Sequence, residues 1–393
     1  MLQLSPHTGE RKMKEKDFLN WKIGVIIVTL IVVGAVIGYV LYQRELSAGS
    51  GNSGNRSTLV IYTYNSLFQY GANPNQTMNI VFKAFESMYN VNIVIDYPSA
   101  GLLSTLLTQK SKPQADIVIG LTNVEEPAAV SNGLLIPYNV SGDNNIPGWL
   151  TSDLSTHHYL TPYEYSYLSI DYMMNFYNET KGEIAHSNFQ NFTNGTWAKN
   201  LIVENPTTSI TGENFLIWQI AYYQYVLHQS NWESWWSSVK NKVTVEKGWS
   251  SAFNLFTTAG TPQQAVVSYA TDPAYEMYNN SVYNATMQYN ATLSENNGSI
   301  YGWNTIYGIG IVNGSKNINL DKAFINWFLS GTVQNQIPLN EWEYPANSTV
   351  HLPSVYRYAV NSDNVISLNN YMTRTEISVN LNTWLEDWQV TMS

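Results

Sequence analysis

Length, composition and charge set the first limits on this chain. Its 393 residues, 44% hydrophobic and 13% aromatic, are enough to build one large two-lobed domain or two ordinary domains around proper cores. Only 12% of the residues are charged, the formal net charge is −10 and there is no Cys. A nucleic-acid partner is therefore not expected, and disulfides, thiol chemistry and Cys-ligated zinc are excluded.

The N-terminal region predicts a membrane anchor. "IGVIIVTLIVVGAVIGYVL" is a run of 19 residues without a charge, long enough at about 1.5 Å per residue to cross a hydrocarbon core of roughly 30 Å. We place the transmembrane helix at residues 23–42. Five basic side chains precede it, so the positive-inside rule holds residues 1–22 in the cytoplasm and the rest of the chain outside the cell. The alternative is a cleaved signal peptide, whose apolar core normally runs only about 7 to 15 residues.

The segment after the anchor predicts a linker and an acidic exterior domain. Residues 43–57 are rich in Gly, Ser and Asn, which is typical of a flexible linker, and the extracellular domain follows at 58–393. Residues 51–393 carry 13 basic and 25 acidic side chains. Asn-X-Ser/Thr acceptors agree with an exterior location and predict a glycoprotein. The candidate acceptors are Asn55, Asn75, Asn139, Asn178, Asn191, Asn194, Asn279, Asn284, Asn290, Asn297, Asn313 and Asn347.

The first part of the exterior domain alternates predicted strands and helices. "TLVIYTY" (58–64) is β-branched and aromatic, and residues 80–88 place apolar side chains on one face of a helix. The alternation in "VNIVIDY" (91–97) predicts a second strand, the leucines of 102–107 a short helix, and the apolar run 115–121 a buried strand. This βαβαβ order predicts a parallel sheet that binds ligands at the carboxyl ends of its strands.

A second α/β unit begins in the middle of the chain. "LIVENP" (201–206) predicts a strand, and the hydroxyl-rich "TTSITG" leads into a long apolar helix whose N-terminus presents free backbone N–H groups. "KVTVEKGWSSAFNLF" and "QQAVVSYATDPAY" each predict a short strand ending in an aromatic residue, and Asp272-Pro273 is typical of a turn. A strand at 306–312, part of a helix at 323–328 and a terminal helix at 371–388 complete the chain.

Several motifs in this order carry a resemblance to a known family. The runs "VTVEKGWSSAFNLF", "VVSYATDPAY" and "QNQIPLNEWEYPAN" resemble the extracellular solute-binding proteins of ABC importers, and among them the thiamine-binding branch. The likeness extends from Leu59 to about Gln389. It implies a type II periplasmic-binding-protein fold of two α/β lobes, about 58–162 with a return segment from about 300, and about 163–299. It also implies a binding protein rather than an enzyme, with no cofactor, which passes one small solute to an ABC permease and its ATPase.

The resemblance also implies a set of ligand-binding residues. An aromatic residue follows the first strand at Tyr64, and the hydroxyl-rich turn contributes Ser209; a plain strand-end tyrosine and a simple helix N-cap are the alternatives. The aromatic walls of the family's cleft would be Trp249, Tyr269, Tyr275 and Trp342, for which packing in the core is the alternative. Glu164 and Asp272 would add acidity, unless Glu164 lies on the surface and Asp272 only supports its own turn.

Three departures from the thiamine-binding branch bear on the solute. Asn65, Ser99 and Thr122 stand where that branch usually has carboxylates. We therefore expect a thiamine-like or other aromatic or cationic compound, held by aromatic faces that attract cations. A sugar or another neutral solute is the alternative, because sugars also stack on Trp. More remote are a structural glycoprotein and a surface glycoside hydrolase, since Glu341 and Glu343 would lie beside each other on an extended segment rather than across a substrate.

Overall fold

The computed structural model describes residues 56–140, 145–281 and 287–393. The predicted cytoplasmic segment, transmembrane helix and almost all of the linker lie outside these ranges, as do the acceptors Asn55 and Asn284. Within the described ranges no helix is long and apolar enough to span a bilayer. The anchor at 23–42 stays a prediction, which retention of the full chain in membranes after alkaline carbonate extraction would test.

Strands and helices alternate through most of the unit formed by Ser57–Ser393. The strands are β1 (Ser57–Tyr62), β2 (Val91–Asp96), β3 (Ile117–Thr122), β4 (Leu135–Ile136), β5 (Thr161–Met173), β6 (Leu201–Glu204), β7 (Thr244–Glu246), β8 (Ala265–Tyr269), β9 (Tyr289–Thr292), β10 (Ser294–Asn296), β11 (Ser299–Gly302), β12 (Asn304–Val312), β13 (Tyr344–Pro345) and β14 (Val365–Ser367). The α-helices are α2 (Pro74–Met78), α3 (Ala84–Tyr89), α4 (Leu102–Thr108), α5 (Glu126–Ser131), α6 (Gly148–Leu154), α7 (Met174–Glu179), α8 (Gly195–Asn200), α9 (Ile210–Ala221), α10 (Glu233–Val239), α11 (Trp249–Thr257), α12 (Asp272–Ser281), α13 (Ile318–Phe328), α14 (Gly331–Gln334), α15 (Ile337–Asn340) and α16 (Arg374–Met392). Shorter helical turns are η1 (Asn79–Lys83), η3 (Glu183–His186), η4 (Phe189–Thr193), η5 (Tyr222–Val226), η6 (Ser354–Tyr358) and η7 (Leu368–Asn370).

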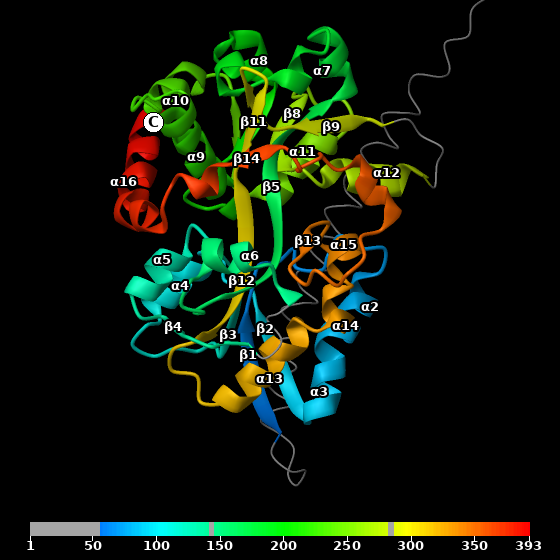
Figure 1. The fold of residues 1–393 in the computed structure, drawn as a ribbon, viewed down its shortest axis with the longest axis vertical. Helices are drawn as coiled ribbons and strands as arrows, with labels where there is room; N and C mark the ends of the chain where they lie inside the picture. The colour runs from blue at the N-terminus through cyan, green and yellow to red at the C-terminus, as the bar shows by residue number, and fades with distance from the viewer. Residues whose placement is uncertain (1–55, 141–144, 282–286) are drawn as a thin grey trace, which may run out of the picture. The chain divides into compact units, whose positions relative to one another are not determined.

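One sheet passes through both lobes. Its 11 strands include the path β2-β1-β3-β12-β5-β8-β6-β7, and β1 pairs in parallel with β2 and β3, as the βαβαβ order predicts. The long strand β5 pairs with β12 through residues 161–167 and with β8 through residues 168–172. It therefore belongs to both halves of the sheet, with lobes above and below in Figure 1. This arrangement confirms the predicted two-lobed α/β fold.

Each lobe has its own core. In the first, fully buried aliphatic side chains such as Ile61 and Ile119 lie beneath α3 and α13, whose rings Phe85 and Phe324 meet edge to face at 5.0 Å. The second core is built around large aromatic side chains. Trp218, Trp235, Trp236 and Trp303 are all buried there. Apolar packing of this kind stabilises each lobe without disulfides.

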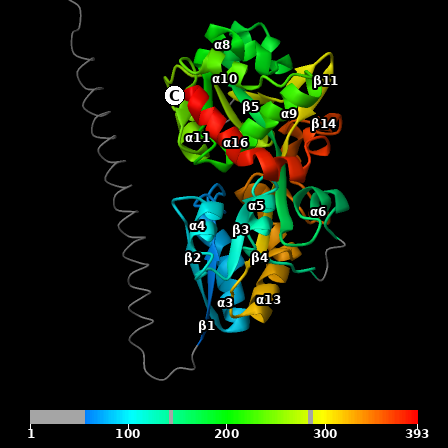
Figure 2. The ribbon, with the colours of Figure 1, turned by 90° about the vertical axis from the view of Figure 1, so that its left-hand side faces the viewer.

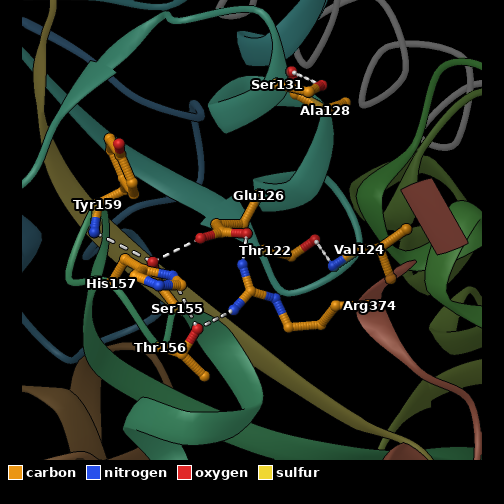
Figure 3. Close-up of polar contacts among 10 residues, drawn as sticks. All are labelled: Thr122, Val124, Glu126, Ala128, Ser131, Ser155, Thr156, His157, Tyr159 and Arg374. Carbon is orange, nitrogen blue, oxygen red and sulfur yellow. Dashed lines mark hydrogen bonds and ion pairs between the residues drawn. The ribbon is translucent and has the colours of Figure 1, made fainter. Parts of the chain in front are cut away.

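The C-terminal helix α16 does not return to the first lobe, as the predicted return segment implied. By Val360 the chain has already joined the second lobe, since Val360 and Val365 pack against its core, and Trp388 packs edge to face against Trp236 of the same core at 5.7 Å. The helix lies along the second lobe in Figure 2. Its first residue, Arg374, pairs with the buried carboxylate of Glu126 at the start of α5 in the first lobe. Figure 3 shows Arg374 reaching both Glu126 and Thr156. Thus α16 links the two lobes.

Two local predictions are wrong. Asp272-Pro273 begins helix α12 instead of making a turn. Pro is tolerated there because the first helical N–H groups have no intrahelical partner, and an acidic residue is favourable at the same end. The segment around Trp342 is not extended, because Trp342 has a positive φ of 62°. Its neighbours Glu341 and Glu343 are therefore not arranged as on a strand.

The glycan acceptors differ in accessibility. Asn290 is half-buried on β9, and Asn347 is buried with its Nδ2 donating to the Leu329 carbonyl. The folded protein therefore does not offer the Asn347 nitrogen to a glycan. The other described acceptors are exposed and stay predictions. These are Asn75, Asn139, Asn178, Asn191, Asn194, Asn279, Asn297 and Asn313.

Candidate functional site

A cavity of about 560 Å³ is lined by residues of both lobes. The first lobe contributes the segment after β1, and the second contributes the N-terminal ends of α9, α11 and α12. All eight residues predicted to bind a ligand line this cavity, although their position does not by itself show binding. They are Tyr64, Glu164, Ser209, Trp249, Tyr269, Asp272, Tyr275 and Trp342.

Tyr64 lines the cavity, and Gly120 leaves room for its ring. A Cβ on Gly120 would lie 2.5 Å from Tyr64 Cδ1, and Gly120 has a φ of +112°. The Tyr64 hydroxyl is 2.8 Å from Glu164 Oε1 and 3.0 Å from the Tyr163 hydroxyl. The close approach of β3 to the ring therefore sets where the phenol meets the carboxylate.

Replacing Gly120 by Ala is expected to lower the free energy of unfolding by about 1–3 kcal/mol, because the new methyl group collides with Tyr64 and the backbone strains at positive φ. Urea denaturation measures this loss. Gly101→Ala is a control for the backbone term, since Gly101 has a φ of +84° with no atom within 4 Å of its Cβ position. Equal losses in the two variants would show that the Tyr64 contact is unimportant.

Aromatic rings from both lobes line one wall. Tyr70 of the first lobe meets Trp249 edge to face at 5.0 Å, and Trp342 meets Tyr275 at 5.2 Å. Trp249 stacks on Phe253 at 5.0 Å and donates its indole N–H to Ser268 Oγ over 2.8 Å. Trp249 is half-buried, whereas Trp342 is only 3% exposed, so Trp342 is also part of the packing between the lobes.

Tyr269 and Ser209 already have partners within the protein. The Tyr269 hydroxyl lies 2.6 Å from that of Tyr307 and 3.0 Å from Thr211 Oγ1. Ser209 is the N-cap of α9, where its Oγ accepts the Gly212 N–H. The simple N-cap proposed as the alternative for Ser209 is therefore present, and both side chains hold the cavity wall in place.

Asp272 lies at the junction of β8 and α12. Its Oδ2 accepts the Ser268 hydroxyl and the Tyr269 backbone N–H at 3.2 Å. Trp249 donates to the same serine, so a chain of hydrogen bonds connects the indole to the carboxylate. Burial raises the pKa of Asp272 to about 6, although hydrogen bonds from Ser268 and Tyr269 oppose the shift.

Two acidic residues that were not predicted as binding residues also line the cavity. Glu341 is half-buried and Glu343 is 6% exposed. They were missed because the sequence "EWEY" was interpreted as extended, while the positive φ of Trp342 turns the chain at that point. Only an unusual backbone conformation brings both glutamates to the cavity, and no residue pattern in the sequence signals it.

The cavity is acidic and has little basic compensation. Besides Glu164, Asp272, Glu341 and Glu343, its charged lining includes a single basic side chain, the exposed Lys247. Burial raises the pKa of Glu164 to about 8, and burial together with neighbouring carboxylates raises the pKa values of Glu341 and Glu343. A cavity of this kind favours a cation. No group of three or more His, Asp or Glu side chains in the described ranges is placed to hold a metal ion.

The three departures from the thiamine-binding branch take different positions. Asn65 and Ser99 line the cavity, so both neutral side chains stand where they can affect the solute. Thr122 is buried outside the lining, and its backbone N–H donates to Glu125 Oε2. The cavity therefore has its carboxylates mainly on the β5 and α15 side rather than after the first strands.

Comparison with known proteins agrees with the fold and the sequence motifs. The family profile described as bacterial extracellular solute-binding protein matches residues 71–335. The thiamine-binding periplasmic protein of Brucella suis biovar 1 (strain 1330) is 27% identical over 336 residues, which cover 85% of this chain and 91% of that protein. The protein of the same name from Escherichia coli (strain K12) is 27% identical over 342 residues, covering 86% and 94%.

Solved structures share the fold. A periplasmic thiamin binding protein aligns with a TM-score of 0.71 and 24% identity over 88% of this chain and 99% of the other. Iron-bound HitA from Pseudomonas aeruginosa aligns with a TM-score of 0.64 and 14% identity over 84% of this chain and 99% of the other. At these identities the likeness shows the fold alone, and one of these proteins is named for thiamin whereas the other is iron-bound.

Proposed function

Because this chain belongs to the bacterial extracellular solute-binding protein family, we propose that it captures a small aromatic cation, thiamine-like in chemistry, in the cavity between its lobes. It then delivers this solute to the permease of an ABC importer. The relatives that match most of the chain are thiamine-binding periplasmic proteins, which are binding proteins and not enzymes. Two lobes around one cavity suit capture by closure.

The acidic, aromatic lining of the cavity is the observation that supports a cation most directly. Tyr70, Trp249 and Tyr275 offer ring faces or edges, and the carboxylate of Asp272 is buried close to Tyr70 and Tyr275. A cation against an aromatic face gains about 0.5–2 kcal/mol, and more in a dry site. A neutral sugar would stack equally well, but it would leave the Asp272 carboxylate without a positive partner. The lining therefore favours a cation over a sugar.

A ligand panel tests this function. Purified full-length protein in detergent is melted with thiamine, with benzyltrimethylammonium and with a neutral disaccharide. A ligand present at 100 times its dissociation constant stabilises the folded protein by about 2.7 kcal/mol, so a binding cation raises the melting temperature. We expect thiamine or the quaternary ammonium compound to raise it, and the disaccharide to leave it unchanged.

Mass spectrometry of small molecules copurified with the protein gives an independent answer. An organic cation released on denaturation supports the proposal. A shift with the disaccharide alone, together with a copurified sugar, would instead establish the neutral-solute alternative.

A further inference from the structure

Glu164, Glu341 and Glu343, here called the glutamate cluster, are three of the four acidic residues that line the cavity. We propose that this cluster binds a second positively charged group of the solute, one that carries N–H donors, such as an ammonium or an amidinium. This group enters in exchange for a proton that the empty cluster retains. The proposal rests on the proposed function, because the aromatic wall holds the first cation, and it adds the chemical class of the other end of the solute.

Geometry brings two of the carboxylates to one phenol. The Tyr64 hydroxyl oxygen lies 2.8 Å from Glu164 Oε1 and 3.3 Å from Glu341 Oε2. A single hydroxyl proton can be donated to only one of them at a time. The second oxygen of Glu341 accepts the Phe68 backbone N–H. The Tyr163 hydroxyl is a second side-chain donor to Glu164. Glu164 and Glu341 therefore share the hydroxyl protons of Tyr64 and Tyr163, which leaves acceptor positions available to a solute.

Unpartnered buried oxygens point to the same conclusion. Glu164 is 1% exposed and Glu343 is 6% exposed, and the Oε2 atom of each is buried without a hydrogen-bond partner. Leaving a buried acceptor unpaired costs about 1–3 kcal/mol, and more for a charged group. Both residues line the cavity, so a solute with several N–H groups would satisfy atoms that the protein leaves unsatisfied.

The groups around the cluster supply no positive charge. Acidic Asp272 acts on Glu343 from the start of α12, and Ser166 of β5 donates to the same residue. No Lys, Arg or His of the described chain contributes to the titration of the three glutamates. The remaining ionisable neighbours are phenols from several segments of the chain. They are Tyr64, Tyr70, Tyr163, Tyr269, Tyr307, Tyr344 and Tyr356.

Neutralisation must therefore come from a proton or from the solute. Burial raises the pKa of Glu164 to about 8, so this carboxyl carries a proton at pH 7 in the empty cavity. A bound cation favours the charged carboxylate, lowers this pKa and releases the proton. Affinity for such a solute consequently rises as the pH approaches the pKa of Glu164, about 8.

The first cation alone does not need this cluster. A quaternary nitrogen has no N–H to donate and is held by ring faces, as at Trp249. An ammonium or amidinium donates several charge-assisted hydrogen bonds, which are about twice as strong as neutral ones. The aromatic wall and the glutamate cluster therefore select two different kinds of positive group.

Two matched probes distinguish binding at the aromatic wall from binding at the glutamate cluster. One is 4-methylbenzyltrimethylammonium, with one charge and no N–H, and the other is 4-(aminomethyl)benzyltrimethylammonium, which adds a primary ammonium to the same ring. Isothermal titration calorimetry of the full chain at pH 7 in phosphate and in Tris gives both affinity and proton release. We expect the second probe to bind at least about tenfold more tightly and to release up to about one proton.

Variants locate the effect. Glu164→Gln keeps the shape of the protonated carboxyl and is expected to fold, and both it and Glu341→Gln should bring the affinity ratio of the two probes to within about threefold. Glu183→Gln removes an exposed carboxylate of the second lobe and should leave both ratio and proton release unchanged. A thermal melt of each variant confirms folding.

The outcomes distinguish this inference from the proposed function. Binding of neither probe contradicts the proposed function itself. Equal affinity for the two probes, or tighter binding of the second that persists in both Gln variants without proton release, overturns only the assignment of the glutamate cluster.

Discussion

Replacing Trp249 by Ala is expected to weaken binding of the preferred organic cation by at least about 30-fold, since a central Trp in a binding site typically contributes 2 kcal/mol or more. Trp249 stacks on Phe253 and touches Tyr70 across the cavity, and its indole N–H reaches Ser268, which in turn donates to Asp272. The variant loses an aromatic face and also the donor that orients this serine. Calorimetric titration with the tightest cation of the panel measures the effect.

Trp149→Ala is the matched control for this loss. Trp149 is 42% exposed on α6, meets Tyr165 edge to face at 5.1 Å and does not line the cavity. The Trp149→Ala substitution removes the same kind of side chain, with the same loss of volume, but at a position outside the cavity. The affinity for the cation should therefore stay within about twofold of the unmodified protein. Circular dichroism checks that both variants fold. An affinity for Trp249→Ala equal to that of the control would remove Trp249 from the site.

Much of the fold follows from local periodicity. β1, β2 and β3 were predicted within a few residues because each is a short β-branched run bounded by polar residues, and their βαβ spacing already implies parallel pairing. The dual role of β5 was not predictable in this way. Its 13 residues look like one strand, and only the tertiary structure decides that β12 pairs with one half and β8 with the other.

The C-terminal helix shows the same limit. Its existence was predicted, but the predicted return segment implied the first lobe. An amphipathic helix can cover either core. The packing of Trp388 against Trp236 places the helix on the second lobe. Which distant segments pack together is determined by the assembled fold, so local sequence patterns do not predict it.

Part of the candidate site came from motif resemblance rather than from chemistry. Tyr64, Trp249 and Glu164 were placed through collinear motifs, and the structure brings them to one cavity. Glu341 and Glu343 were set aside because an extended backbone was assumed, whereas the positive φ of Trp342 redirects both. Positive φ in a non-glycine residue is uncommon and has no reliable sequence signal, which explains this error.

Removing Arg374 is expected to destabilise the protein strongly. Glu126 is 1% exposed, and Arg374 of α16 is its charged partner from the other lobe, as Figure 3 shows. In Arg374→Met the methionine preserves much of the side-chain volume but leaves a buried carboxylate unpaired, which costs about 3–5 kcal/mol. Urea denaturation of the full chain at pH 8 measures this loss in the free energy of unfolding. Arg357→Met, which removes an exposed arginine, should change it by less than about 0.5 kcal/mol.

The pH dependence identifies the cause. Burial raises the pKa of Glu126 even beside Arg374, and loss of the guanidinium raises it further. An acid whose pKa is higher in the folded than in the unfolded protein destabilises the folded state at pH values above its unfolded pKa. The loss in the free energy of unfolding is therefore larger at pH 8 than at pH 5, where the Glu126 carboxyl binds a proton. Adding Glu126→Gln to Arg374→Met removes the unpaired charge while keeping an acceptor for Ser155, and should restore most of the stability at pH 8. Equal losses at both pH values, with no rescue by the double variant, would mean that packing of α16 rather than the buried charge sets the stability of this contact.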